Sequence, residues 1–138
     1  MKSAIVDSGF LVALGIASDP RHCSAKAFVA RYRGTLLVPA PVIVESSYFL
    51  STAGKVSLLD WLAVRCKILD VPVGAYPEIG AILAKYSTLD PDFTDAAIVW
   101  LATEHDCSAV LTADDRDFET FRIRANKRFV LVDWQSAG

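Results

Sequence analysis

Hydrophobic positions along the chain alternate between short continuous runs and longer stretches with helical spacing. The short runs cover residues 4–6, 36–38, 68–71, 109–111 and 129–132, and most are bounded by turn-forming or charged residues. Uninterrupted apolar runs of this length are typical of strands that are buried on both faces, as in a parallel sheet. The pattern therefore predicts five buried strands.

The stretches between these runs predict helices. Apolar residues recur at helical spacing over residues 24–32, 42–51, 56–67, 76–85 and 93–105. Strands that alternate with helices indicate a mostly parallel central sheet with helices on both faces, because parallel strands need crossover connections. The sequence thus predicts the α/β class, as a three-layer α/β/α sandwich, with no internal repeat or linker to divide it.

Composition narrows this picture to a globular protein without a general affinity for polyanions. The chain has 138 residues, of which 53% are hydrophobic, and its formal net charge is −2. A domain of this size can bury a sufficient core without disulfides or a structural metal. Because the chain has no overall positive charge, a nucleic acid would have to bind at a local basic patch.

Neither a membrane span nor a secretory signal is expected. Every apolar stretch is interrupted well before the roughly 18 residues that a spanning helix needs. Lys2 and the apolar residues 9–17 imitate a signal peptide, but Asp7 falls where a signal would be apolar. The three cysteines are Cys23, Cys66 and Cys107. Their odd number and wide spacing favour reduced thiols, so we expect a cytoplasmic protein.

Four acidic residues from four separate stretches are the candidate site. Asp7 closes the first predicted strand, and Asp114 follows the strand at residues 109–111. Glu45 and Asp95 fall in the first turns of predicted helices. Because ligands of open parallel sheets bind beyond the carboxyl ends of the strands, all four acids are expected at one cleft.

Each acid also has a structural interpretation. Asp92 with Asp95, and Asp114 with Asp117, have the spacing of a helix cap and its third helical residue. Acids in a first turn complement the helix dipole, and Asp7 suits a turn. Taken singly, each acid is explained by capping, whereas their conjunction in apolar surroundings points to a reactive cleft.

Clustered carboxylates require protons or a cation. Two unit charges about 4 Å apart repel by about 4 kcal/mol at an effective dielectric near 20. Oxygen ligands suit a hard ion such as Mg²⁺, with Mn²⁺ able to substitute, rather than zinc. Such an ion supports phosphate chemistry without a catalytic histidine. The two histidines, His22 and His105, accordingly receive no catalytic role.

Four motifs resemble one known family. They are VDSGFLVAL at residues 6–14, VIVE at 42–45, DFTDAAIV at 92–99 and LTADDRDF at 111–118. Their order and spacing resemble a PIN domain, and specifically the VapC-type toxins of bacterial toxin–antitoxin pairs. The resemblance spans nearly the whole chain, so residues 1–138 are expected to form a single PIN-like domain.

The resemblance implies a metal-dependent endoribonuclease. Its acidic quartet, which would bind the metal and carry catalysis, corresponds to Asp7, Glu45, Asp95 and Asp114. Ser8 and Thr112 would support the site with their hydroxyls. Asp92 and Asp117 would either assist the metal or only cap a helix.

The substrate and partners follow from the same resemblance. Arg116, Arg122 and Arg124 are candidate RNA contacts, and their alternative is a solvated loop. VapC-type toxins are typically homodimers, bound by an antitoxin that inserts an Arg among the acids and itself binds DNA. The helices predicted at residues 42–51 and 56–67 carry enough apolar surface for an interface. Aromatic residues there, such as Tyr48, are expected in the core or a dimer contact.

Three other functions share part of this sequence pattern. A phospho-acceptor receiver domain needs paired acids at Asp7 and a Lys after the last strand, where Asp133 and Trp134 stand. A hydrolase with an aspartyl nucleophile needs a second acid at Gly9. A catalytically idle PIN-like module that binds RNA or partners remains as the alternative, although binding alone gives no reason to keep repelling carboxylates together.

Overall fold

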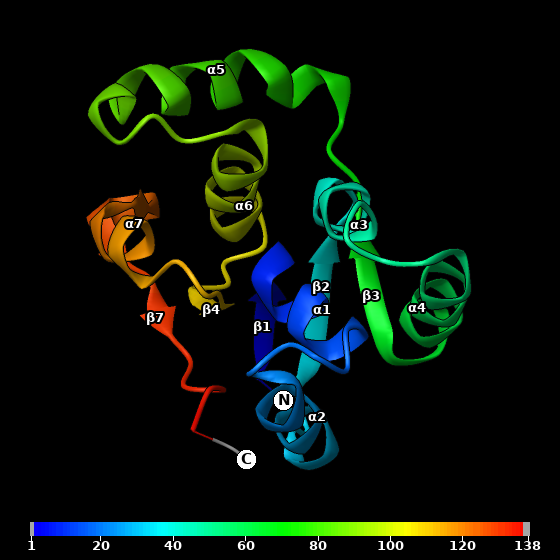
Figure 1. Cartoon of the computed structure of the whole chain (residues 1–138). Coiled ribbons are helices and arrows are strands. Elements are labelled where there is room, and N and C mark those ends of the chain that lie inside the picture. The colour runs from blue at the N-terminus through cyan, green and yellow to red at the C-terminus, as the bar shows by residue number, and fades with distance from the viewer. Residues whose placement is uncertain (1, 137–138) are drawn as a thin grey trace.

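The computed structural model describes residues 2–136 and has a five-stranded parallel sheet at its centre. The strand order is β3-β2-β1-β4-β7, and each adjacent pair is parallel. The strands are β1 (Ser3–Val6), β2 (Thr35–Pro39), β3 (Cys66–Leu69), β4 (Ala109–Leu111) and β7 (Val130–Leu131). All five predicted strands are therefore present, and the predicted α/β class is confirmed (Figure 1).

Seven helices flank this sheet in the described part of the chain. They are α1 (Ser8–Gly15), α2 (His22–Arg31), α3 (Ala40–Ser47), α4 (Thr52–Arg65), α5 (Tyr76–Lys85), α6 (Phe93–Glu104) and α7 (Asp115–Thr120). Helix α1 packs on α2 and α3, and α6 packs on α5. In Figure 1, α5 lies across the end of α6, at the far side of the molecule from α2.

The sequence pattern misplaced several helix boundaries. Helices were predicted over residues 42–51 and 56–67, but α3 ends at Ser47 and α4 spans Thr52–Arg65, so Cys66 and Lys67 belong to strand β3. The apolar periodicity continues through Tyr48 and Phe49, yet these side chains are 83% and 63% exposed. The hydroxyl of Ser51 accepts the Gly54 amide N–H at 3.1 Å and so starts the second helix.

The periodicity did not predict four short elements. Helix α1 is apolar along its length, so no polar face marks it. Helix α7 has only 6 residues. Strands β5 (Arg122–Ile123) and β6 (Lys127–Arg128) form an antiparallel hairpin, whose turn places Ala125 and Asn126 in the left-handed region. Elements this short carry too few positions for a periodic signal.

The core lies on both sides of β1, whose apolar residues are fully buried. The largest fully buried side chains include Trp134, Phe10, Phe118 and Phe121. The three free cysteines range from buried (Cys107) through half-buried (Cys66) to exposed (Cys23). Within residues 2–136, no helix has the length and apolar character needed to cross a membrane.

Candidate active site

A cleft of about 290 Å³ opens beyond the carboxyl ends of β1 and β4. We call it the acidic cleft. It is lined by Asp7, Ser8, Gly9, Glu45, Asp92, Asp95, Ala113 and Asp114. The four acids predicted from the sequence thus come together from α1, α3, α6 and the loop before α7, together with Asp92.

Asp7 is the most constrained of these acids. It follows β1 directly, and its amide N–H donates to the Leu111 carbonyl at 2.9 Å, which ties it to β4. Its side chain accepts the Ser8 amide N–H at 2.7 Å and the Thr112 hydroxyl at 2.8 Å. Only 6% of the residue is exposed. The carboxylate is therefore held in one orientation at the base of the cleft.

The two hydroxyl residues named from the sequence both contact the acids. The Ser8 hydroxyl donates to the Glu45 carboxylate at 2.6 Å, which links the start of α1 to α3. The Thr112 hydroxyl, besides donating to Asp7, accepts the Asp114 amide N–H at 2.9 Å. Their predicted role as supports of the carboxylates agrees with these contacts.

The first turn of α6 carries a capping box. Asp92 accepts the amide N–H of Asp95 at 2.8 Å, and Asp95 accepts the amide N–H of Asp92 at 3.3 Å. The structural interpretation of this pair is therefore correct. Both residues also line the acidic cleft, so capping and exposure to the cleft coexist in the same side chains.

Asp114 caps α7 in the same way. Its side chain accepts the Asp117 amide N–H at 3.3 Å, and Asp114 itself lies at the cleft. Burial, followed by repulsion from Asp114, raises the pKa of Asp117, but Asp117 is absent from the residues that line the cleft. Of the two uncertain acids, Asp92 is thus the one that faces the site.

The electrostatics of the cleft are unfavourable for free carboxylates. Burial, with added repulsion from Glu45 and Asp92, raises the pKa of Asp7 from 3.8 to about 6. Burial, with added repulsion from Asp92, Asp7 and Asp114, raises the pKa of Asp95 from 3.8 to about 7. Two hydrogen bonds to Asp7 work in the opposite direction without compensating. The cleft therefore favours a proton or a cation.

The donor set fits a hard divalent cation, because every candidate ligand is an oxygen atom. Among residues 2–136, no three acidic, imidazole or thiol side chains already stand close enough together to hold a metal ion. The residues that could hold an ion are Asp7, Glu45, Asp95 and Asp114.

Comparison with known proteins identifies the family. The model of the family described as PIN domain matches residues 4–123, which include all four acids. The chain is a member of the PIN domain family. The resemblance seen in the sequence motifs is thereby confirmed, and the acidic cleft lies within the matched region.

Relatives of this PIN domain include Ribonuclease VapC26 of Mycobacterium tuberculosis, which is 25% identical over 133 residues. That alignment covers 93% of this chain and 98% of VapC26. Among solved structures, Mycobacterium tuberculosis VapC20, described as a Sarcin-Ricin loop cleaving toxin, has a TM-score of 0.72 at 19% identity. The match covers 80% of this chain and 91% of the VapC20 chain. VapBC2 from Rickettsia felis, bound to a promoter DNA fragment, has a TM-score of 0.66 at 17% identity. The match covers 95% of this chain and 99% of the VapBC2 chain.

The predicted RNA contacts lie in different settings within this PIN domain. Arg116 and Arg124 are exposed, the first on α7 and the second in the β5–β6 hairpin. Arg122 is half-buried, and its guanidinium donates to three carbonyls at the end of α7, at 2.7–3.0 Å. Arg122 therefore caps the end of α7. Its role in binding RNA stays a prediction.

A second hollow, of about 600 Å³, lies between α1, α2 and α4. We call it the apolar groove. It is lined by Leu14, Gly15, His22, Lys26, Val29, Ala30, Ala53, Gly54, Ser57, Leu58 and Trp61. The sequence pattern predicted apolar excess in α4 but not this groove, because the groove needs three helices from separate stretches.

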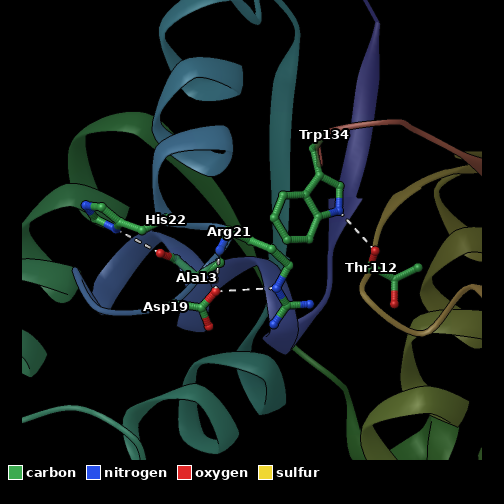
Figure 2. Close-up of polar contacts among 6 residues, drawn as sticks. All are labelled: Ala13, Asp19, Arg21, His22, Thr112 and Trp134. Atoms are coloured by element: carbon green, nitrogen blue, oxygen red, sulfur yellow. Dashed lines mark hydrogen bonds and ion pairs between the residues drawn. The ribbon is translucent and has the colours of Figure 1, made fainter. Parts of the chain in front are cut away.

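Two residues of the site were missed or undervalued in the sequence. A Cβ atom on Gly9 would lie 2.8 Å from the Cβ of Ala113, so α1 and the loop after β4 approach too closely for a larger residue. Trp134 donates its indole N–H to the Thr112 carbonyl at 3.0 Å (Figure 2). A glycine two residues after the first acid was a usable signal, whereas nothing local to Trp134 points to the cleft.

Proposed function

We propose that this PIN domain is a divalent-metal-dependent endoribonuclease that acts as the toxin of a type II toxin–antitoxin pair. The observation that carries this proposal is the convergence of four acids from four chain segments on one cleft. The relatives named as ribonuclease and toxin support it, as does the family itself. A fold of capped helices alone would not require the acids to meet.

The proposed cofactor is Mg²⁺, with Mn²⁺ as a substitute, held by Asp7, Glu45, Asp95 and Asp114. When bound, such an ion would supply a polarised water and neutralise charge on the scissile phosphate. The raised pKa values of Asp7 and Asp95 support this site, because burial first, and repulsion from neighbouring acids second, makes their ionised forms unfavourable without a cation.

The chain's own residues would orient the reacting groups. Thr112 and the Ser8 amide hold both oxygens of Asp7, and the Ser8 hydroxyl holds one oxygen of Glu45. The reaction would break a phosphodiester bond by hydrolysis.

RNA would be held by basic residues next to the cleft. Arg116 and Arg124 are exposed, and Lys127 and Arg128 are exposed on the same hairpin as Arg124. Lysine and arginine side chains of this kind neutralise phosphates and release counterions, which makes binding dependent on salt. We propose that the β5–β6 hairpin and α7 form the RNA-contacting edge.

The proposed antitoxin would bind at two places. The apolar groove suits the apolar face of a partner segment, because α1, α2 and α4 leave it uncovered within this chain. An arginine of the partner would enter the acidic cleft and pair with its carboxylates, inhibiting the enzyme by competition with the metal. The similar structure of VapBC2 from Rickettsia felis, which is bound to a DNA fragment from its promoter, supports such a partner. DNA would be reached only through that partner.

We further propose a homodimer in the cytoplasm. Exposed apolar side chains lie along α3, α4 and the turn between them, including Val44, Tyr48, Val56 and Leu59. These would bury apolar area against a second copy. Tyr48 is 83% exposed in the single chain, so it does not lie in the core. Its place in a dimer contact stays a prediction.

The decisive experiment is cleavage of an end-labelled single-stranded RNA by the purified protein, with Mg²⁺ or Mn²⁺ and with EDTA. Asp95→Asn is compared with Asp60→Asn, a matched change at an exposed acid of α4 outside the cleft. We expect cleavage that requires metal, is lost in Asp95→Asn and persists in Asp60→Asn.

The opposite result would favour the idle binding module. In that case wild type and both variants would leave RNA intact, and neither metal would raise the melting temperature. Binding of RNA without cleavage would then be the remaining activity to measure.

A further inference from the structure

The segment after β7 runs beside β4, the strand whose carboxyl end borders the acidic cleft. The Val132 amide N–H donates to the Val110 carbonyl at 3.0 Å, so this segment continues beside β4. Two residues later, Trp134 is only 1% exposed. Its ring meets Phe10 edge to face, with centroids 5.0 Å apart, and the Arg21 guanidinium lies 5.7 Å from the ring centroid. Arg21 is itself held by Asp19 (Figure 2).

The indole N–H of Trp134 reaches the loop that organises the cleft. It donates to the Thr112 carbonyl at 3.0 Å, as Figure 2 shows. The hydroxyl of the same Thr112 donates to Asp7 at 2.8 Å and accepts the Asp114 amide at 2.9 Å. One threonine thus stands between Trp134 and two of the four acids.

Trp134 also contacts the second segment that shapes the cleft. Its ring packs on Phe10, which lies three residues after Asp7 and in the first half of α1. The indole therefore spans the start of α1 and the end of β4, the two elements between which Asp7 and Asp114 face the cleft. A buried ring with one polar atom can hold two elements at a set distance by packing between them. Its hydrogen bond then fixes the orientation of the backbone group that accepts it.

We propose that Trp134 is a positioning residue of the nuclease site, which holds Thr112 so that Asp7 and Asp114 face the cleft in their working orientation. This inference rests on the proposed function for its catalytic meaning. Partners that orient metal ligands from behind commonly change metal affinity or activity by about 10- to 100-fold when they are removed. Trp134 acts through Thr112 and touches neither the carboxylates nor the substrate.

The test separates the hydrogen bond from the bulk of the ring. Trp134→Phe keeps an aromatic ring against Phe10 but removes the N–H that Thr112 accepts. The chain offers a matched control in Trp100, whose indole N–H donates to Glu78 and which does not line the cleft. Trp100→Phe makes the same chemical change at a hydrogen bond unrelated to the cleft.

Mn²⁺ affinity, measured by titration calorimetry or by the electron spin resonance signal of free Mn²⁺, is the first readout. We expect Trp134→Phe to weaken it by about 10-fold and to lower kcat for RNA by a similar factor, with KM little changed. Trp100→Phe should match wild type, with all proteins compared equally far below their melting temperatures. Equal Mn²⁺ affinity and kcat in the two variants would reduce Trp134 to a packing residue.

Hydrogen exchange in the wild-type protein gives a second readout that needs no variant. The indole N–H of Trp134 and the amide N–H of Asp114 should be protected to the same extent, because one opening of the Thr112 loop would release both. A freely exchanging Asp114 amide beside a protected Trp134 indole would overturn the proposal. If wild type cleaves no RNA with any metal, the proposed function fails, while Mn²⁺ affinity and exchange still decide the role of Trp134.

Discussion

The acidic cleft and the apolar groove lie at opposite ends of the same short helix. Asp7, Ser8 and Gly9 at the start of α1 line the cleft, and Leu14 and Gly15 at its end line the groove. The cleft, at about 290 Å³, gathers several carboxylates, and the pKa values of two of them, Asp7 and Asp95, are raised. The groove, at about 600 Å³, is lined mainly by small and apolar residues.

The two hollows are unfavourable in different ways. In the cleft, charges are held together at a cost that a cation would relieve. In the groove, apolar surface stays in contact with water at a cost that a partner would relieve. The cleft therefore has the character of a reaction site and the groove that of a binding site, and variants that affect one without the other test this division.

The largest expected effect is on the cleft. Glu45→Gln removes one negative charge and one of the proposed metal ligands while keeping the shape of the side chain. We expect RNA cleavage to fall by about 100- to 1000-fold, the usual cost of losing a group that stabilises charge in the transition state. Cleavage of labelled RNA at saturating Mg²⁺ measures it. Glu104→Gln, at an exposed acid ending α6, should cleave normally; equal activity in both variants would exclude Glu45 from the site.

The second prediction concerns stability and pH. Because the pKa of Asp7 is higher in the folded protein (about 6) than its ordinary 3.8, the folded state binds the extra proton between these values. The contribution of Asp7 to stability is then fully present below about pH 3.8 and is lost as pH rises through about 6. For metal-free protein, we expect wild type to lose about 2 kcal/mol more than Asp7→Asn between pH 4 and 7.5.

Urea unfolding in EDTA at several pH values measures this difference. Asp60→Asn, at an exposed acid, serves as the control and should follow the wild-type pH curve. Parallel curves for wild type and Asp7→Asn would mean that burial does not raise the pKa of this carboxyl group. The electrostatic difference between the cleft and the groove would then be wrong.

The third prediction concerns the groove. Ala30→Glu places a charge at an exposed position of α2 that lines the groove. We expect a cognate antitoxin to bind about 10-fold more weakly, because the larger, charged side chain would have to be accommodated and desolvated where the partner covers the groove. Calorimetry measures the affinity, and RNA cleavage without antitoxin should not change. Ala84→Glu, on the exposed side of α5, is the control; equal affinity in the two variants would place the partner elsewhere.

The smallest expected effect is on RNA binding. Arg124→Ser should weaken RNA binding a few-fold and reduce the slope of log K against log salt by about one, as the loss of one phosphate contact predicts. Filter binding to catalytically inactive Asp95→Asn protein at several salt concentrations measures the slope. An unchanged slope, equal to that of the exposed control Arg33→Ser, would assign Arg124 to the solvated loop.

Much of the fold and the site could be predicted because the signals are local. Buried parallel strands appear as continuous apolar runs, and all five were found. An acid that ends a strand or begins a helix has its position set by that element, so Asp7, Asp95 and Asp114 could be placed at one edge. The capping interpretation was equally visible, and the structure shows that it holds together with a place at the cleft.

Other features had no local signal. Tyr48 and Phe49 continue an apolar periodicity, yet the chain turns there and leaves both exposed. Helix α1 is apolar along its length, with Phe10, Leu11 and Ala13 buried, so its sequence resembles a strand or a signal segment. The groove depends on the packing of three helices from separate stretches of the chain. The Arg122 side chain donates to carbonyls at the end of α7, which its sequence neighbours do not indicate.

The sequence by itself determined the parallel α/β fold, the family and the identity of the acids, because each depends on residue type and order over a few positions. Only the tertiary structure decided how these acids are held. Asp7 owes its burial to β4 and Thr112, Glu45 is tied to α1 by Ser8, and Thr112 is held from behind by Trp134. Such contacts join segments up to 105 residues apart, and their energies depend on distances and desolvation that exist only once the chain has packed.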